Sequence, residues 1–183
     1  MALPPLATLD DLTARLPQPP ANEARANTAL ADASAAVRAY TGQEITERTS
    51  TARLKVVAPG VLRLPQAPVT DVDDVTGRDG VTLTWELVVQ TIEVWAPNGT
   101  YLDVTYTHGY TEVPDDIVAV VCNIAGRAIF TGPETAGLTQ ESITNYSASY
   151  GPVTAAGPVG LFDAEKMVLD RYRLPVGPVW VAS

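Results

Sequence analysis

The chain has 183 residues, of which 46% are hydrophobic and 18% charged, and its formal net charge is −9. This length fits one domain with a sizeable core, and this composition disfavours wholesale disorder. The negative charge argues against a protein that binds DNA by neutralising its phosphates. The single cysteine, Cys122, excludes an internal disulfide framework and fits a reducing compartment. No signal peptide is evident, and the longest apolar run, 117–122, is too short to span a membrane, so we expect a soluble protein made in the cytoplasm.

The N-terminal part is predicted to be helical. The segment Thr8–Asp11 resembles a capping box in which Asp11 takes the place of the usual Glu, and prolines from Pro17 onward end this short helix. Asn22 is expected to cap a second helix with apolar residues at helical spacing, and Gly42 to end it. The many alanines of the second helix suit close contact with another helix.

Strand patterns begin near Arg48, and residues 48–112 are predicted to form an antiparallel sheet inserted between helical parts. Turns are expected at Pro59-Gly60, at Gly77–Gly80 and at Pro97–Gly99, the last two as hairpin turns. The strands expected between these turns are 52–57, 61–64, 69–75, 81–85, 91–95 and 101–106.

The most informative segment runs from Val104 to Ile117. Tyr106, His108 and Tyr110 alternate with smaller residues, which is the period of a half-buried strand. Pro114 then fixes the first helical turn, where two aspartates suit the helix dipole. Residues 117–130 are apolar on nearly every face, which is typical of a helix at the centre of a domain.

Beyond residue 130 the chain is predicted to form a polar loop, and residues 141–150 an extended arm or edge strand. Asp163 is expected to cap a last helix that continues through Arg173, and a tail with two prolines and a glycine follows. The predicted fold class is therefore α+β. It has a small helical bundle core, made of the N-terminal helices, the central buried helix and the C-terminal helix, with an inserted antiparallel β-sheet.

No catalytic, cofactor-binding or metal-binding residue is predicted, and we expect a protein that is not an enzyme. His108 is the only histidine, so a zinc site is effectively excluded, and both His108 and Cys122 are expected to be buried structural residues. No nucleophile elbow, phosphate loop or dinucleotide motif occurs. The acidic run lacks the spacing of a calcium loop and is predicted to keep a hairpin edge soluble; its members are Asp71, Asp73, Asp74 and Asp79.

The end of the last helix and the tail are predicted to bind a partner subunit. The tail is apolar, cannot form a helix, and contains a tryptophan, a frequent interface anchor, while arginine is enriched at interfaces. The predicted partner-binding residues are Arg171, Tyr172, Arg173, Leu174, Val176, Val179, Trp180 and Val181. A second basic set, Arg48, Arg53, Lys55 and Arg63, is interpreted as surface charge, with nucleic-acid contact as the alternative.

The order of several segments resembles one family. They are Tyr40-Thr41-Gly42 after the Ala-rich helix, the run Leu64-Pro65-Gln66-Ala67-Pro68-Val69-Thr70-Asp71-Val72, the strand and helix start of 104–117, the polar segment 141–147, and the last helix 163–173. Together they are similar to the head-to-tail connector proteins (adaptor or head-completion proteins) of long-tailed bacteriophages, especially those of actinobacterial hosts. The likeness covers residues 6–173 and leaves the tail unmatched.

The resemblance implies a structural protein of the virion neck, made in the host cytoplasm. Such adaptors form a ring, in the family a dodecamer, that binds the portal protein and bridges it to the stopper, and DNA passes through the ring without specific binding. It implies one adaptor domain over 1–183, with a β insertion at 48–112 and an extended tail at 174–183. The last helix and tail would reach the portal, residues 131–160 would face the channel or the tail side, and acidic residues would line the channel.

A second interpretation is a binding module of a phage particle that holds carbohydrate or protein on its β-sheet. Aromatic side chains on the strands could then form a stacking platform, although such residues are more often core residues or cross-strand pairs. The residues concerned are Trp85, Trp95, Tyr101, Tyr106 and Tyr110.

Overall fold

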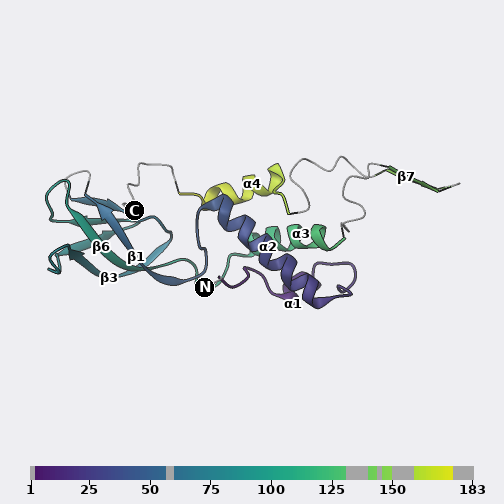
Figure 1. Cartoon of the computed structure of the whole chain (residues 1–183), viewed down its shortest axis with the longest axis horizontal. Coiled ribbons are helices and arrows are strands. Elements are labelled where there is room, and N and C mark those ends of the chain that lie inside the picture. Colours follow the sequence, from purple (N-terminus) through teal and green to yellow (C-terminus); the bar gives the residue numbers. More distant parts are fainter. Residues whose placement is uncertain (1–2, 57–59, 131–139, 144–145, 150–158, 175–183) are drawn as a thin grey trace. The chain divides into compact units, whose positions relative to one another are not determined.

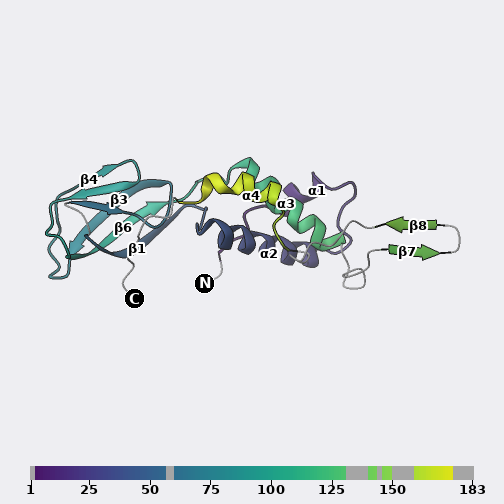
Figure 2. The same ribbon diagram turned by 90° about the horizontal axis from the view of Figure 1, so that it is seen from above.

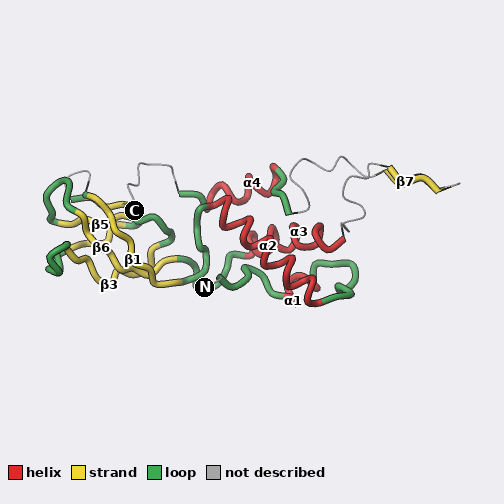
Figure 3. The backbone as a smooth tube through the Cα atoms, in the orientation of Figure 1, coloured by secondary structure: helices red, strands yellow, loops and turns green. Residues whose placement is uncertain are grey.

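The computed structural model describes residues 3–56, 60–130, 140–143, 146–149 and 159–174, the two short segments by their backbone alone (Figure 1). The chain divides into two compact units. Residues up to Thr41 and from Pro114 to Arg171 form one, here called the helical unit. Gly42–Val113, with the described residues after Arg171, form the other, here called the β unit. Figure 3 shows that the helices belong to the first and strands β1 to β6 to the second.

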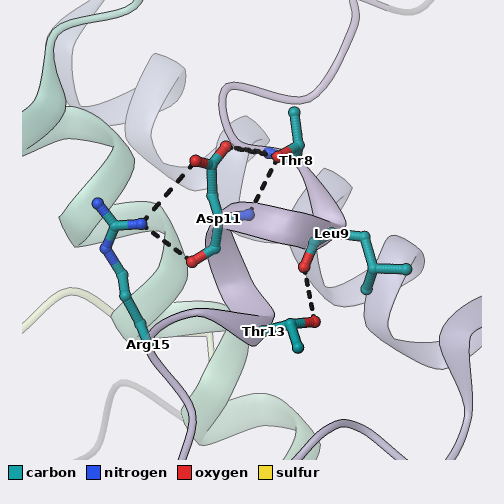
Figure 4. A network of polar contacts seen from close by, with 5 residues as sticks. All are labelled: Thr8, Leu9, Asp11, Thr13 and Arg15. Carbon is teal, nitrogen blue, oxygen red and sulfur yellow. Dashed lines mark hydrogen bonds and ion pairs between the residues drawn. The ribbon is translucent and has the colours of Figure 1, made fainter.

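The helical unit contains α1 (Leu9–Thr13), α2 (Glu23–Thr41), α3 (Asp115–Phe130) and α4 (Asp163–Leu169). The predicted capping box is confirmed at α1, since the Thr8 hydroxyl accepts from the Asp11 amide at 3.1 Å and the Asp11 carboxylate accepts from the Thr8 amide at 2.8 Å (Figure 4). The Thr8 hydrogen bonds lower the pKa of Asp11. The predicted cap of α2 is also confirmed, because the Asn22 side-chain oxygen accepts from the Arg25 amide at 3.0 Å.

Helix α3 forms the core of the helical unit, as its apolar sequence predicts. Its buried residues cover most of the helix circumference, and it contacts α1, α2 and α4 (Figure 2). The facing side of α2 is lined with alanines, whose small side chains let the two backbones approach. The buried alanines are Ala26, Ala29 and Ala33. Gly42 ends α2 with a φ of +70°, the left-handed conformation expected of that position.

Helix α4 differs from the prediction at both ends. Phe162, rather than Asp163, is the N-cap, and its amide donates to the Glu165 carboxylate at 2.8 Å. The α-helix ends at Leu169 and the 3₁₀-helix η1 (Asp170–Tyr172) follows, so the regular helix stops before Arg173. The tighter last turn is common at helix ends, where backbone carbonyls lack helical partners.

The β unit contains two antiparallel three-stranded sheets among its described residues. Strands β1 (Arg48–Lys55), β6 (Tyr101–His108) and β3 (Val69–Gly77) form one sheet in that order. Strands β2 (Val61–Arg63), β5 (Thr91–Val94) and β4 (Trp85–Val88) form the other. The α+β fold class with inserted antiparallel strands is confirmed, and the insertion holds two sheets rather than one.

Of the two predicted hairpins, the one at Pro97–Gly99 is wrong and the one at Gly77–Gly80 is reduced to a single bridge. The Asn98-Gly99 turn exists, but it connects β5 to β6, which lie in different sheets, while β5 forms its hairpin with β4. Strand β2 also pairs with β5. The Gly77–Gly80 turn is present, but only a single bridge, Thr76 to Thr82, follows it. Turn residues show where the chain reverses, whereas the partner strand is chosen by burial against a common core.

Alternation along β6 confirms the predicted half-buried strand. Leu102, Val104, Tyr106 and His108 are buried, and the residues between them face outward. The inward residues of both sheets pack in one hydrophobic cluster, so each sheet has one core face and one outer face. Tyr106 is only 1% exposed, and burial raises the pKa of its phenol to about 12.

The two ends of the β unit's strand region lie side by side. Thr46, before β1, forms a parallel bridge with Tyr110, after β6. Gly109, the residue before Tyr110, has a φ of +92°, and a Cβ on it would lie 2.5 Å from the Thr46 carbonyl oxygen. Only glycine fits this close backbone contact.

A short hairpin lies between α3 and α4 in the sequence. Strands β7 (Gln140–Ile143) and β8 (Tyr146–Ser149) pair antiparallel, within the segment predicted to be an extended arm or edge strand (Figure 2). No helix among the described residues is long and apolar enough to cross a bilayer.

Candidate interaction surfaces

The predicted partner-binding residues lie partly within the described structure. Arg171 and Arg173 are exposed, while Tyr172 and Leu174 are half-buried. Arg171 forms an ion pair with Asp116 at the start of α3, and the Tyr172 ring packs edge-on against Tyr110 with centroids 6.1 Å apart. Val176, Val179, Trp180 and Val181 lie outside the described residues.

A half-buried ion pair fixes α4 against α3. The Arg127 guanidinium donates to both Glu165 carboxylate oxygens, at 2.5 and 3.1 Å, and to the Gly160 carbonyl at 2.8 Å. It also stacks over the Phe162 ring, 4.0 Å from the centroid. Such two-pronged contacts set orientation as well as distance. The last helix, which leads to Arg171, is therefore held in a defined position on the helical unit.

The outer face of the β2-β5-β4 sheet carries the most exposed aromatic side chain among the described residues. Trp95, just after β5, is 91% exposed. Two residues earlier Glu93 pairs across the sheet with Glu86 on one side and Val61 on the other. We call Val61, Glu86, Glu93 and Trp95 the Trp95 patch. Placing two carboxylates opposite each other is unfavourable in an isolated sheet and gives this face a local negative charge.

The Trp95 patch borders a groove of about 540 Å³. Its lining includes Gly60, Val61, Thr84, Glu86, Glu93 and Trp95. A groove lined by both an indole and carboxylates suits a cationic side chain, because the ring face and the carboxylates both attract positive charge.

The outer face of the β1–β6 pair has the opposite character at its corresponding end. Lys55 pairs across the strands with Tyr101, and Arg53 with Asp103. Both cationic groups lie over the Tyr101 ring, at 5.9 Å for Arg53 and 5.8 Å for Lys55. We call Arg53, Lys55, Tyr101 and Asp103 the Tyr101 patch. Further along the pair this face is neutral, with threonine hydroxyls paired across the strands.

The predicted basic set is therefore only partly assembled. Arg48, Arg53 and Lys55 all lie on β1, where Arg48 pairs with Glu44 and Arg53 with Asp103. Arg63 lies on β2, in the other sheet. The positive charge is thus spread over two sheets, which agrees with the interpretation as surface charge rather than with a continuous nucleic-acid track.

The aromatic residues considered for a stacking platform do not share one face. Tyr106 is buried in the core, and Trp85 packs partly against that core from β4. Trp95 lies outward on one sheet, whereas Tyr101 lies outward on the other. A flat platform of the kind that binds carbohydrate by stacking is not formed by these residues together.

His108 and Cys122 are both buried, as predicted. The His108 Nε2 is 2.9 Å from the Ser50 hydroxyl, while its Nδ1 is buried without a hydrogen-bond partner among the described residues. Burial lowers the pKa of His108, so the ring is neutral at pH 7, and burial raises the pKa of the Cys122 thiol. Neither group has the exposure that a nucleophile or proton shuttle needs.

The acidic run lies mainly on β3, which is an edge strand as predicted. Asp71 and Asp79 accept from backbone amides two or fewer residues away, and Asp74 from the Thr76 hydroxyl. Within the described residues no group of three or more His, Cys, Asp or Glu side chains is arranged to hold a metal ion. These carboxylates act locally, on turns and on the strand edge.

Of the residues in the Trp95 patch, the sequence suggested only Trp95, as part of a stacking platform, although it held more of the signal. Ile92 and Val94 are apolar neighbours that point inward, and alternation then places Glu93 and Trp95 outward. The juxtaposition of Glu86 with Glu93 depends on strand register, which the sequence pattern did not reveal.

Two solved structures share this fold. The chain matches one in "Neck of empty GTA particle computed with C6 symmetry" with a TM-score of 0.58 and 20% identity, over 97% of this chain and 95% of that chain. It matches one in "Virion of native gene transfer agent (GTA) particle" with a TM-score of 0.52 and 20% identity, over 93% and 89%. No family model matches the chain. No curated protein matches it. The chain therefore has the fold of a component of gene transfer agent particles, and in one case of the particle neck.

Proposed function

We propose that this chain is a structural protein of the neck of a phage-like particle, and more specifically a head-to-tail adaptor. Copies would form a ring beneath the portal, link the capsid to the stopper or tail, and continue the channel through which DNA leaves. The fold match to a neck chain carries this proposal, because it extends over 97% of this chain and 95% of the other. A match of that extent includes both units and not only a common sheet.

Other features support a role that depends on surfaces. The described titratable groups with perturbed pKa values are buried structural residues or local hydrogen-bonding partners. The outer faces of the β unit instead carry exposed aromatic and charged side chains. The net charge of −9 suits a channel that DNA traverses without sticking. A dodecameric ring, as in phage adaptors of actinobacterial type, is compatible with the C6 symmetry used for the neck of the neighbour.

For the direction of the adaptor in the neck, we propose that the end of α4 and the tail contact the portal. The Arg127–Glu165 ion pair holds α4 against α3, so Arg171, which follows α4 in the same unit, has a defined position on the helical unit. Residues 131–160 would then face the channel or the tail side.

The ring proposal is tested by mixing the full chain with purified portal and imaging the product by electron microscopy. We expect an added ring of density on the portal, with rotational symmetry and a mass that gives the copy number. The complementary experiment removes the gene from a producing strain. Particles that join heads to tails and retain DNA without this protein would refute the proposal, whatever the outcome with isolated portal.

The portal contact is tested with a matched pair of variants. Trp180→Ala should weaken portal binding at least tenfold if the tail is the anchor. Val89→Ala, which removes an exposed apolar side chain in the turn between β4 and β5, should leave binding unchanged. Equal binding by both variants and the parent chain would place the portal contact elsewhere.

A further inference from the structure

We propose that the Trp95 patch of one copy binds the Tyr101 patch of a second copy of this chain, and that this contact joins neighbouring protomers. The contact is heterologous, because two different surfaces meet, and such contacts close into rings when the rotation between copies permits. The inference deepens the proposed function, on which it rests, by assigning the contact that holds the ring together.

The first argument is charge complementarity. The Trp95 patch carries Glu86 and Glu93 side by side, whereas the Tyr101 patch carries Arg53 and Lys55. Each surface also has one charge of the opposite sign close by. Near the Trp95 patch this is Arg63, which pairs with Thr91, two residues before Glu93 on β5; in the Tyr101 patch it is Asp103, which pairs with Arg53. A chain with a net charge of −9 repels its own copies, so an attractive contact between copies needs such a local match.

The second argument is the position of the patches. Both lie on outer faces of the β unit, on different sheets that share one core, so they point away from that core in different directions. Trp95 follows the last residue of β5, and Tyr101 is the first residue of β6, so both aromatic residues lie at the ends of these strands that the short 95–100 segment joins. One copy can therefore offer one patch to each of two neighbours at the same level.

The third argument is the shape of the Trp95 patch. Its groove of about 540 Å³ has room for the flexible side chains of Lys55 or Arg53, which would lie against the Trp95 indole and the two carboxylates. Tyr101, 38% exposed, would cover part of the indole that is now in solvent. Tryptophan, tyrosine and arginine, which the two patches would bring together, are the residues most enriched among interface hot spots.

The test uses two charge-reversed forms of the full chain. The form with Glu86→Lys and Glu93→Lys is basic on both surfaces, and the form with Arg53→Glu and Lys55→Glu is acidic on both. Each form alone brings surfaces of like charge together at every contact. In an equal mixture the two forms can alternate around the ring, so that a basic surface meets an acidic one at each contact. The readout is the number of copies incorporated per particle when protein is added to particles that lack it, measured by quantitative mass spectrometry.

We expect each reversed form alone to be incorporated at less than a tenth of the parent level, and the mixture to recover at least half of that level. A control with Asp32→Lys and Glu112→Lys, which makes the same change in net charge as the Glu86→Lys and Glu93→Lys form but at exposed sites outside both patches, should be incorporated like the parent chain. Circular dichroism of each form establishes that it folds.

Three results overturn the inference. The first is incorporation of both reversed forms at the parent level, and the second is failure of both forms and of their mixture although each is folded. If only the form with Glu86→Lys and Glu93→Lys fails, the groove binds a different neck protein or the chain's own tail. Failure of the parent chain to enter particles at all would instead refute the proposed neck function, so the two failures are distinguishable.

Discussion

Replacing Gly109 with alanine should destabilise the β unit by about 3 to 4 kcal/mol. At its φ of +92° an L side chain alone costs about 1–2 kcal/mol. The added Cβ would also lie 2.5 Å from the Thr46 carbonyl oxygen and 2.8 Å from that of Ile45. Both contacts are with backbone, which cannot rotate aside as a side chain does.

The backbone would therefore have to separate at the point where the ends of the strand region meet. That movement weakens the hydrogen bond from the Tyr110 amide to the Ile45 carbonyl, at 2.7 Å, and the one from the Glu47 amide to the Tyr110 carbonyl, at 2.9 Å. Each contributes about 1 kcal/mol to stability. The two terms, backbone conformation and lost hydrogen bonds, together give the expected magnitude.

Gly99→Ala is the matched control. Gly99 has nearly the same φ, +87°, but a Cβ there meets nothing within 4 Å, so only the conformational cost of about 1–2 kcal/mol applies. Urea unfolding followed by tryptophan fluorescence reports on the β unit, which contains Trp85 and Trp95. Equal destabilisation by the two variants would refute the argument that the close approach to Thr46 matters.

Three further predictions concern buried groups. Arg127→Met should destabilise the helical unit by about 2 kcal/mol, measured by far-ultraviolet circular dichroism melts. This is below the usual range for a broken buried pair, because the Arg127 side chain is 26% exposed. Adding Glu165→Leu should recover part of the lost stability, since it removes the carboxylate left without its partner. Burial lowers the pKa of His108, so the unfolded chain binds more protons, and the free energy of unfolding should fall as pH drops below about 6.5 towards the folded pKa. His108→Gln should remove the decrease in that window, and an unchanged pH profile would contradict the assignment. Cys122 should react with a thiol reagent far more slowly than in urea, and equal rates would show that the thiol is accessible in the folded state.

Helix positions could be predicted from the sequence because their signals are local. Thr8 and Asn22 cap residues only three positions away, and Gly42 ends α2 through its own φ. The fold class and the buried nature of α3 followed from apolar spacing alone. The end of α4 was predicted too far along the chain, because the change to a 3₁₀ turn leaves no residue signal of its own.

Strand partners could be predicted less well from the sequence, because strand pairing depends on contacts between residues that are distant in the chain. Asn98-Gly99 has the residues of a hairpin turn, yet β5 and β6 join different sheets on either side of the shared core. The same limit hid the Trp95 patch, since the pairing of Glu86 with Glu93 exists only in the correct register. By contrast, the portal-binding role of Trp180 came from composition and stays a prediction.

The parallel bridge between Thr46 and Tyr110 has an evolutionary consequence. A segment that enters and leaves through adjoining points can grow, shrink or be exchanged with little disturbance to the chain on either side. The strand-rich part of this protein therefore has the geometry of a segment that tolerates insertion, deletion or exchange. Related chains could therefore differ in the surfaces of this part while the helical unit stays the same.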